Sequence, residues 1–219
     1  MPRTPAAIFL CDESGVMARP WAEAGIECFC VDVQHSIRRD RKEGNINFVW
    51  GDARSWTPPP GLDILFVAAF PPCTHVSVSG TRDHPKKRGH MLRDALETFE
   101  ACRQAASWSG APYCIENPVG ILSSIPHIGK PDFYFHPWEY AGWAEDDHYT
   151  KKTCLWTGNG FVMPLKRPAP HLAHLAPDNR IHFASPSSDR GDIRSVTPAG
   201  FARAVFEANA PAQYRKAAA

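Results

Sequence analysis

The sequence lacks a hydrophobic run long enough to cross a membrane. Its longest apolar stretches, such as residues 64–70, are far shorter than the roughly 20 residues that a membrane-spanning helix needs. The N-terminal segment is also a poor signal peptide, because only a short apolar stretch precedes Asp12 and Glu13. We therefore expect a cytoplasmic protein with no membrane partner.

The chain also lacks a large excess of charge of either sign. Its formal net charge is +1, so it does not have the overall basic character of many nucleic-acid-binding domains. Basic residues nevertheless form clusters, at Arg38, Arg39, Arg41 and Lys42, at Lys86, Lys87 and Arg88, and at Lys151 and Lys152. Each cluster by itself fits a solvated loop as well as it fits a phosphate contact.

Three common sequence signatures are missing. The seven cysteines are odd in number and irregularly spaced, which indicates reduced thiols rather than a disulfide framework. Cys28 and Cys30 lie in an apolar run, a pattern typical of two thiols on one face of a strand, so we expect no metal site. A full G-x-G-x-x-G is absent from the first turn, which argues against a dinucleotide and favours a nucleoside cofactor without a pyrophosphate.

Short apolar runs alternate with helical patterns along the chain of 219 residues. The predicted strands are Ala6–Cys11, Cys28–Val31, Ile46–Trp50, Ile64–Ala69 and Pro112–Ile115. The predicted helices are Val16–Ala24 and Met91–Trp108, with a last helix entered at Pro198. This alternation predicts a single α/β domain over residues 1–219, Rossmann-like, with a mostly parallel sheet and helices on both faces.

Polar residues follow the ends of the predicted strands, where open α/β sheets bind ligands. Asp12, Asp32 and Asp52 each come directly after an apolar run. Asp32 lies about 20 residues beyond the first turn, at the distance where an acidic side chain commonly accepts hydrogen bonds from ribose hydroxyls. Any one of them is a routine turn residue, but together along one sheet edge they predict a cofactor crevice.

The stretch FPPCTHVSVSG, residues 70–80, ends the fourth predicted strand. Pro71 and Pro72 cannot continue the sheet ladder, and they stiffen the backbone that carries Cys73. Cys73 is either a buried corner thiol or a nucleophile, and Glu116, at the end of the neighbouring strand, favours the second. A thiolate that adds to carbon-6 of cytosine, with an acid at ring nitrogen 3, makes carbon-5 nucleophilic.

These motifs, in this order over most of the chain, resemble those of the DNA cytosine carbon-5 methyltransferases. Pro71-Pro72-Cys73, with Ser77 four residues on, resembles the family's nucleophile loop, and Glu116-Asn117 resembles its Glu-Asn pair. The patterns at residues 153–156 and 194–197 resemble those of short, phage-type members in particular. The chain departs from the larger family because Pro118 replaces a valine, the Arg-x-Arg motif is missing, and no large target recognition domain is present.

The resemblance implies a methyltransferase fold and methyl transfer from S-adenosylmethionine to a cytosine flipped out of double-stranded DNA. It also implies a monomer in a bacterial or phage-infected cell. The implied catalytic residues are Cys73, Ser77, Glu116, Asn117 and Lys152, the last as the cation for the pyrimidine carbonyl. The implied cofactor-binding residues are Asp12, Glu13, Ser14, Gly15, Met17, Asp32, Val33, Asp52, Ala53, Pro71, Arg194 and Ser195. Lys86, Lys87 and Arg88 are expected to contact DNA phosphates, within DNA-contacting loops at 74–90, 121–150 and 157–190.

Other functions remain open at this stage. Arg194 stands where the larger methyltransferases carry a neutral amide, and an arginine is well suited to grip a carboxylate. An enzyme that uses carboxy-S-adenosylmethionine to make 5-carboxymethylcytosine is therefore an alternative, ranked second to methyl transfer. Modification of free cytosine nucleotides and a non-catalytic nucleic-acid-binding role are further alternatives.

Overall fold

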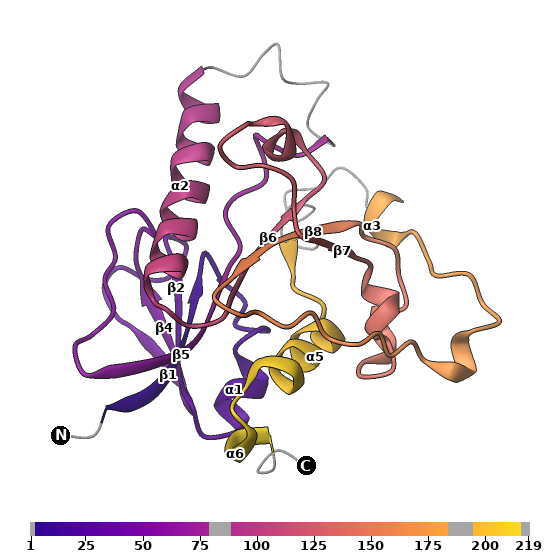
Figure 1. Cartoon of the computed structure of the whole chain (residues 1–219), viewed down its shortest axis with the longest axis horizontal. Coiled ribbons are helices and arrows are strands. Elements are labelled where there is room, and N and C mark those ends of the chain that lie inside the picture. Colours follow the sequence, from indigo (N-terminus) through magenta and orange to yellow (C-terminus); the bar gives the residue numbers. More distant parts are fainter. Residues whose placement is uncertain (1–2, 79–88, 184–194, 216–219) are drawn as a thin grey trace.

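The computed structural model describes residues 3–78, 89–183 and 195–215 and shows an α/β architecture (Figure 1). Its eight-stranded sheet has the order β3-β4-β2-β1-β5-β6-β8-β7. The strands are β1 (Thr4–Leu10), β2 (Glu27–Asp32), β3 (Arg41–Glu43), β4 (Ile46–Trp50), β5 (Leu62–Ala69), β6 (Tyr113–Pro118), β7 (Phe133–Phe135) and β8 (Thr153–Gly158). The central strands β4, β2, β1, β5 and β6 are parallel to one another, and β3, β8 and β7 pair antiparallel with their neighbours.

Helices and short 3-10 turns connect these strands. The α-helices are α1 (Arg19–Glu23), α2 (Gly89–Trp108), α3 (Arg180–Phe183), α5 (Ala199–Asn209) and α6 (Ala212–Arg215). The 3-10 turns are η2 (Ile121–Ser124), η3 (Pro137–Tyr140), η4 (Glu145–Asp147) and η5 (Pro170–Leu172). Within these described ranges, no helix has the length and apolar character needed to cross a membrane.

The sheet has a hydrophobic core on each of its two faces. Alternate residues of β1 divide between them, with Phe9 in one core and Ile8 in the other. On the first face, Trp21 of α1 stacks on Phe66 of β5 with ring centroids 4.6 Å apart, and α5 joins the same core. On the other face, Phe99 of α2 meets the ring of Trp156 edge-on at 5.2 Å. The predicted α/β class, with helices on both faces, is confirmed.

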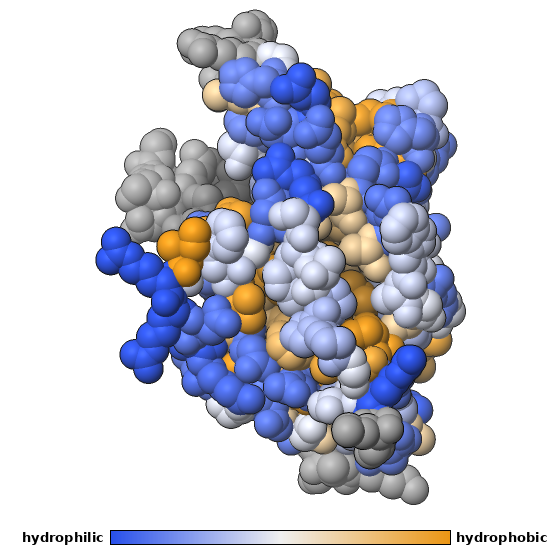
Figure 2. All heavy atoms as spheres, turned by 90° about the vertical axis from the view of Figure 1, so that its left-hand side faces the viewer, coloured by the Kyte–Doolittle hydropathy of each residue, from blue (hydrophilic) through white to orange (hydrophobic). Residues whose placement is uncertain are grey.

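The face of the molecule seen in Figure 2 is mainly hydrophilic, and its hydrophobic residues form small patches between polar ones. This pattern is expected where polar side chains cover the outer side of helices and loops and their apolar side packs inward.

The strand order reverses at β1. The chain passes from β1 to β2 and β4 on one side, and then returns to form β5 and β6 on the other side. A reversal of this kind opens a crevice at the carboxyl ends of the strands, here between β1 and β5. Because β8 runs antiparallel to β6, with Thr153 opposite Pro118, residues just before Thr153 lie at the same edge as the end of β6.

Several elements differ from those predicted. The predicted helix Val16–Ala24 is shorter in the structure, where α1 begins at Arg19. Residues 16–18 form a turn instead, in which the N–H of Ala18 donates to the carbonyl oxygen of Gly15. Gly25 ends this segment at φ +86°, as the pattern predicted. The sequence fitted a solvated loop at the basic cluster of residues 38–42, but part of this cluster forms β3. There the Arg41 guanidinium lies 3.9 Å from the centre of the Phe48 ring. The strand predicted at Pro112–Ile115 begins at Tyr113 and continues through Pro118 as β6, which places Glu116 inside a strand.

Candidate active site

The segment that carries Cys73 is held in place at both ends. The backbone N–H groups of Val76 and Ser77 donate to the carbonyl oxygen of Cys73 at 3.0 and 2.9 Å, which forms one helical turn. Beyond this turn, the N–H of Ile121 donates to the carbonyl oxygen of Val76 at 2.8 Å, and Ser77 forms an antiparallel bridge with Gly120. A side chain at Gly120 would overlap the carbonyl of Val76, so the close approach of the two segments requires glycine. Cys73 itself is half-buried.

Asn117 ties the end of β6 to the proline pair before Cys73. Its Nδ2 donates to the carbonyl oxygen of Pro71 at 2.8 Å, and this contact determines which way the amide points. Its Oδ1 is buried and has no hydrogen-bond partner among the residues that the structure describes. The sequence motif grouped Asn117 with the catalytic residues, and the structure shows its side chain bound to the backbone just before Cys73. Pro71, expected at the cofactor, is buried with its carbonyl occupied by Asn117.

Glu116 faces a buried lysine. Its Oε1 lies 3.7 Å from the Nζ of Lys151, and the two side chains are only 11% and 10% exposed. A charge buried to this degree needs a partner of opposite sign. Lys152 is exposed instead, and its ammonium lies 4.9 Å from the centre of the Tyr134 ring. The cation beside Glu116 is therefore Lys151, and the predicted contact of Lys152 with a pyrimidine carbonyl stays a prediction.

Further ionisable groups lie around this pair. Burial and the charge of Glu116 raise the pKa of Cys154 to about 11. Burial, and then the charges of Asp147 and Glu116, raise the pKa of Tyr149 well above its usual range. Asp147 accepts a hydrogen bond from the N–H of Gly200 at 2.6 Å, and burial raises its pKa to about 6. In the sequence Lys151 is only part of a basic cluster, and Asp147 and Tyr149 carry no signal. The pairing of β8 with β6 brings this stretch of chain to Glu116, and the start of α5 binds Asp147.

The loop after β1 is shaped by Asp12. Its Oδ1 accepts hydrogen bonds from the N–H of Gly15 at 2.8 Å and from the hydroxyl of Ser14 at 3.0 Å. The Asp12 side chain is buried, and this burial raises its pKa. Gly15 has a φ of +68°, and a Cβ there would lie 2.8 Å from the ring of Phe48. Asp12 thus determines the conformation of the loop, while Glu13 is its exposed residue.

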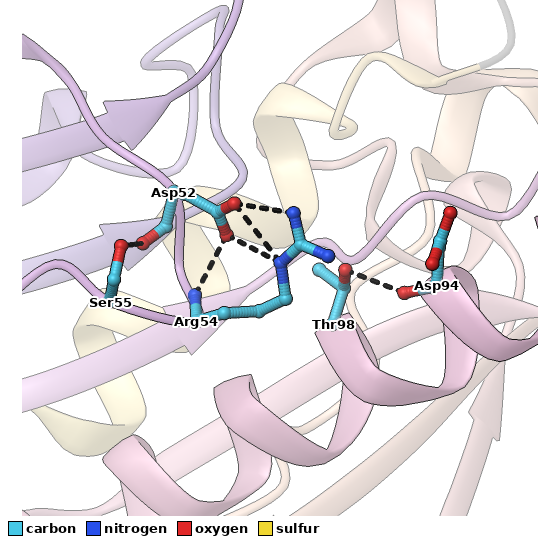
Figure 3. A network of polar contacts seen from close by, with 5 residues as sticks. All are labelled: Asp52, Arg54, Ser55, Asp94 and Thr98. Carbon is cyan, nitrogen blue, oxygen red and sulfur yellow. Dashed lines mark hydrogen bonds and ion pairs between the residues drawn. The ribbon is translucent and has the colours of Figure 1, made fainter.

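The two aspartates at the ends of β2 and β4 are bound differently. Asp32 uses one carboxylate oxygen to accept a hydrogen bond from the N–H of Gln34 at 2.8 Å. Both oxygens of Asp52 are bound by Arg54 (Figure 3), whose Nε lies 2.9 and 3.0 Å from them. These hydrogen bonds hold the pKa of Asp52 below its usual range. Asp32 therefore has one carboxylate oxygen without a bond to Gln34. Both carboxylate oxygens of Asp52, which was expected to meet the adenine amine, are already bound by Arg54.

Apolar side chains are exposed beside Asp32. Val33, directly after β2, is 57% exposed, and Trp50, at the end of β4, is 39% exposed. His35 connects this region to the first loop, with Nδ1 3.0 Å from the carbonyl oxygen of Val49 and Nε2 3.3 Å from that of Glu13. His35 was not predicted, and its place three residues after Asp32 is the only signal for it in the sequence.

The remaining predicted residues have varied positions. Met17 is buried in the core with α1 and α5, and its expected contact with a cofactor stays a prediction. Ala53 is half-buried, and Ser195 is exposed at the start of the last described segment. Arg194, Lys86, Lys87 and Arg88 lie outside the described residues.

The residues at the carboxyl ends of β2 and β4 fit a nucleoside better than a pyrophosphate. They provide a carboxylate, Asp32, and the exposed apolar surfaces of Val33 and Trp50. In the part of the chain that the structure describes, no group of three His, Cys, Asp or Glu side chains could hold a metal ion. No protein-family model and no curated protein matches the sequence.

Proposed function

We propose that the protein is a DNA cytosine carbon-5 methyltransferase that uses S-adenosylmethionine. The observation that supports this most strongly is the link between residues 71–77, the proposed nucleophile segment, and β6. Asn117 holds the backbone before Cys73, and the adjacent Glu116 is buried beside Lys151. The segment that carries Cys73 follows β5 and Glu116 lies in β6, and these two strands are parallel neighbours, since Ala69 of β5 lies opposite Ile115 of β6.

Each residue has a role in this reaction. The sulfur of Cys73 bonds to carbon-6 of the pyrimidine, which raises the electron density at carbon-5. As this charge develops, the carboxyl proton of Glu116 passes to ring nitrogen 3, which leaves Glu116 as a carboxylate. Lys151 keeps Glu116 in place and balances its charge, and Asn117 positions the segment that carries Cys73. After transfer, a water molecule takes the carbon-5 proton, the double bond between carbon-5 and carbon-6 re-forms, and the bond from carbon-6 to the sulfur breaks to release the Cys73 thiolate.

The cofactor crevice is assigned to the ends of β1, β2 and β4. Asp32 would accept the ribose hydroxyls, Val33 and Trp50 would contact the adenine ring, and the loop of residues 12–15 would meet the methionine part. When bound there, S-adenosylmethionine supplies an electrophilic methyl group. The assignment of the sheet to the methyltransferase fold, beyond its α/β class, is part of the same proposal.

DNA is the proposed substrate, and an exposed lysine-aromatic pair near the site supports it. Lys152 lies over Tyr134 of the edge strand β7, and Tyr134 is 47% exposed. Aromatic rings stack with bases and lysines attract phosphates, so such pairs suit a nucleic acid. Lys152 is next in sequence to Lys151, which contacts Glu116. The pair of Lys152 and Tyr134 therefore lies near the same end of the strands as Glu116.

The proposal is tested by the nucleosides of DNA treated with purified protein and S-adenosylmethionine. We expect 5-methylcytosine from the wild type and none from Cys73→Ala, with S-adenosylmethionine affinity unchanged. DNA that contains 5-fluorocytosine should be trapped covalently by the wild type only. An active Cys73→Ala variant would refute the mechanism. The same digest, made with carboxy-S-adenosylmethionine in competition, would reveal 5-carboxymethylcytosine, the alternative suggested by Arg194.

A further inference from the structure

Two cysteines outside the proposed catalytic groups have their sulfur atoms in contact. The Sγ of Cys11, just after β1, lies 3.9 Å from the Sγ of Cys102 in α2. Both are free thiols; Cys11 is half-buried and Cys102 is completely buried. The two residues are 91 positions apart in the sequence, so this contact depends on the packing of α2 against the sheet.

The backbone of Cys11 is held in an unusual conformation. Its φ is +55°, in the left-handed region that residues other than glycine rarely adopt. The N–H of Cys11 donates to the carbonyl oxygen of Val31 at 2.7 Å, and the neighbouring carbonyl of Leu10 accepts from the N–H of Phe70 at 2.9 Å. These contacts to both flanking strands hold the residue while its side chain packs in the core beneath α2.

We propose that Cys11 and Cys102 form a reversible disulfide when the protein meets a hydroperoxide. In the first step, the thiolate of Cys11 attacks the peroxide, the O–O bond breaks, and a sulfenic acid and an alcohol or water form. In the second step, the sulfur of Cys102 attacks the sulfenic sulfur and water leaves with the proton of Cys102. The two thiols together lose two hydrogen atoms, and the hydroperoxide is the species reduced.

The order of the two steps follows from exposure. Cys11 is the thiol of the pair that a small oxidant can reach. The contact with Cys11 and complete burial both raise the pKa of Cys102, which keeps it protonated until Cys11 is oxidised. Only a small fraction of Cys102 is then thiolate, which slows its attack on the sulfenic acid. Its fixed position beside Cys11 offsets this, because the second step is intramolecular. The sulfurs must approach from 3.9 Å to about 2.05 Å, the length of a disulfide bond.

The disulfide would connect the residue before Asp12 to the middle of α2. The closed loop would contain β2, β4, β5 and Cys73, and a loop of this length restricts the unfolded chain strongly. Oxidation should therefore raise the thermal midpoint of unfolding. This property goes beyond the proposed methyl transfer and does not depend on it.

Limited hydrogen peroxide treatment of the full chain in a Cys73→Ser background tests the proposal, since that background lacks the other half-buried thiol. We expect a mass loss of two hydrogen atoms, a Cys11–Cys102 cross-linked peptide, a higher thermal midpoint, and reversal of all three by dithiothreitol. Cys102→Ala should instead accumulate a sulfenic acid at Cys11 that a cyclic 1,3-diketone captures. The matched control Cys114→Ala, which removes another buried thiol, should keep the cross-link.

Cys11→Ser provides a second test that does not depend on the folding of Cys102→Ala. With Cys11 absent, Cys102 should stay reduced under the same peroxide treatment. The proposal is overturned if the cross-link joins other cysteines, or if Cys102→Ala loses the same mass as its parent. Oxidation of Cys102 in the Cys11→Ser variant would also overturn it.

Discussion

Lys151 and Lys152 are neighbours in sequence with different surroundings. Lys151 is buried beside Glu116, whereas Lys152 is exposed over an aromatic ring. Successive residues of an extended segment point to opposite sides, so a single step along the chain separates a lysine of the site from one at the surface. The two lysines provide a matched pair of variants.

We predict that Lys151→Ala destabilises the protein by about 3 kcal/mol, because it leaves Glu116 buried without its cation. Product formation should fall at least about 100-fold if Glu116 acts in proton transfer. Lys152→Ala should change stability by less than about 1 kcal/mol, as expected for an exposed contact. Urea denaturation and single-turnover assays measure both effects. Equal destabilisation by the two variants would contradict the assignment of Lys151.

Two close contacts between secondary-structure elements lie near the proposed site. One is the bridge between the nucleophile segment and the start of η2, where Gly120 lies against the carbonyl of Val76. The other is the start of α5, where Asp147 binds the N–H of Gly200. Each contact joins segments far apart in the sequence, and each can be altered by one substitution.

Gly120→Ala should separate the nucleophile segment from η2, because the added methyl group overlaps a backbone carbonyl that cannot move aside freely. We expect at least a tenfold loss of product formation, together with a lower thermal midpoint. Gly89→Ala, at the start of α2, is the control, since a Cβ there meets nothing within 4 Å. Wild-type activity in Gly120→Ala would show that the position of the segment does not limit the reaction.

Asp147 should make stability depend on pH. Its pKa in the folded protein is raised to about 6 from an ordinary 3.8, so its contribution is most favourable below about pH 4 and is lost as the pH rises through 6. Asp147→Asn keeps an oxygen for the N–H of Gly200 but cannot ionise. Compared with the wild type, the variant should gain unfolding free energy between pH 4.5 and 7.5, as urea titrations would show.

The nearby charges of Asp146, Lys151 and Arg180 also act on Asp147, but they are present in both proteins. The effect of their titration on the unfolding free energy is therefore nearly the same in the variant and in the wild type, and it cancels in the difference. A difference between variant and wild type that is constant over this range would contradict the raised pKa.

For the molecule as a whole, the proposed site and the exposed pair of Lys152 and Tyr134 lie at the same edge of the sheet. DNA bound to the active site would then meet Lys152 and not the far edge strand β3. Lys42 of β3 is comparably basic and exposed, and its ammonium lies 3.5 Å from Glu27.

If Lys152 contacts a phosphate, Lys152→Ala should weaken DNA binding on all sequences and lower the slope of log affinity against log salt by about one. Lys42→Ala should leave the slope unchanged. Binding of the Cys73→Ala protein to a short duplex at several salt concentrations measures this without turnover. If the slope of log affinity against log salt were the same for both lysine variants, the proposed contact between Lys152 and a DNA phosphate would be contradicted.

Local sequence patterns determined most of the secondary structure. The apolar periodicity of α2 and of the central strands was sufficient to predict them, because burial on both sheet faces leaves a regular pattern. Pro71 and Pro72 marked the end of β5 directly, since proline cannot donate to a sheet. The same signals placed Cys73 just after β5, but they ended the next strand before Glu116, which lies inside β6 in the structure.

The tertiary structure decided what each polar side chain contacts. The antiparallel pairing of β8 with β6 brings Lys151 to Glu116, and the packing of α5 brings the N–H of Gly200 to Asp147. The packing of α2 brings Cys102 to Cys11 across 91 positions. Hydrophobic periodicity records which face of an element is buried, but it does not record strand register or the partner of a buried charge. Those depend on distances between segments that are remote in the chain.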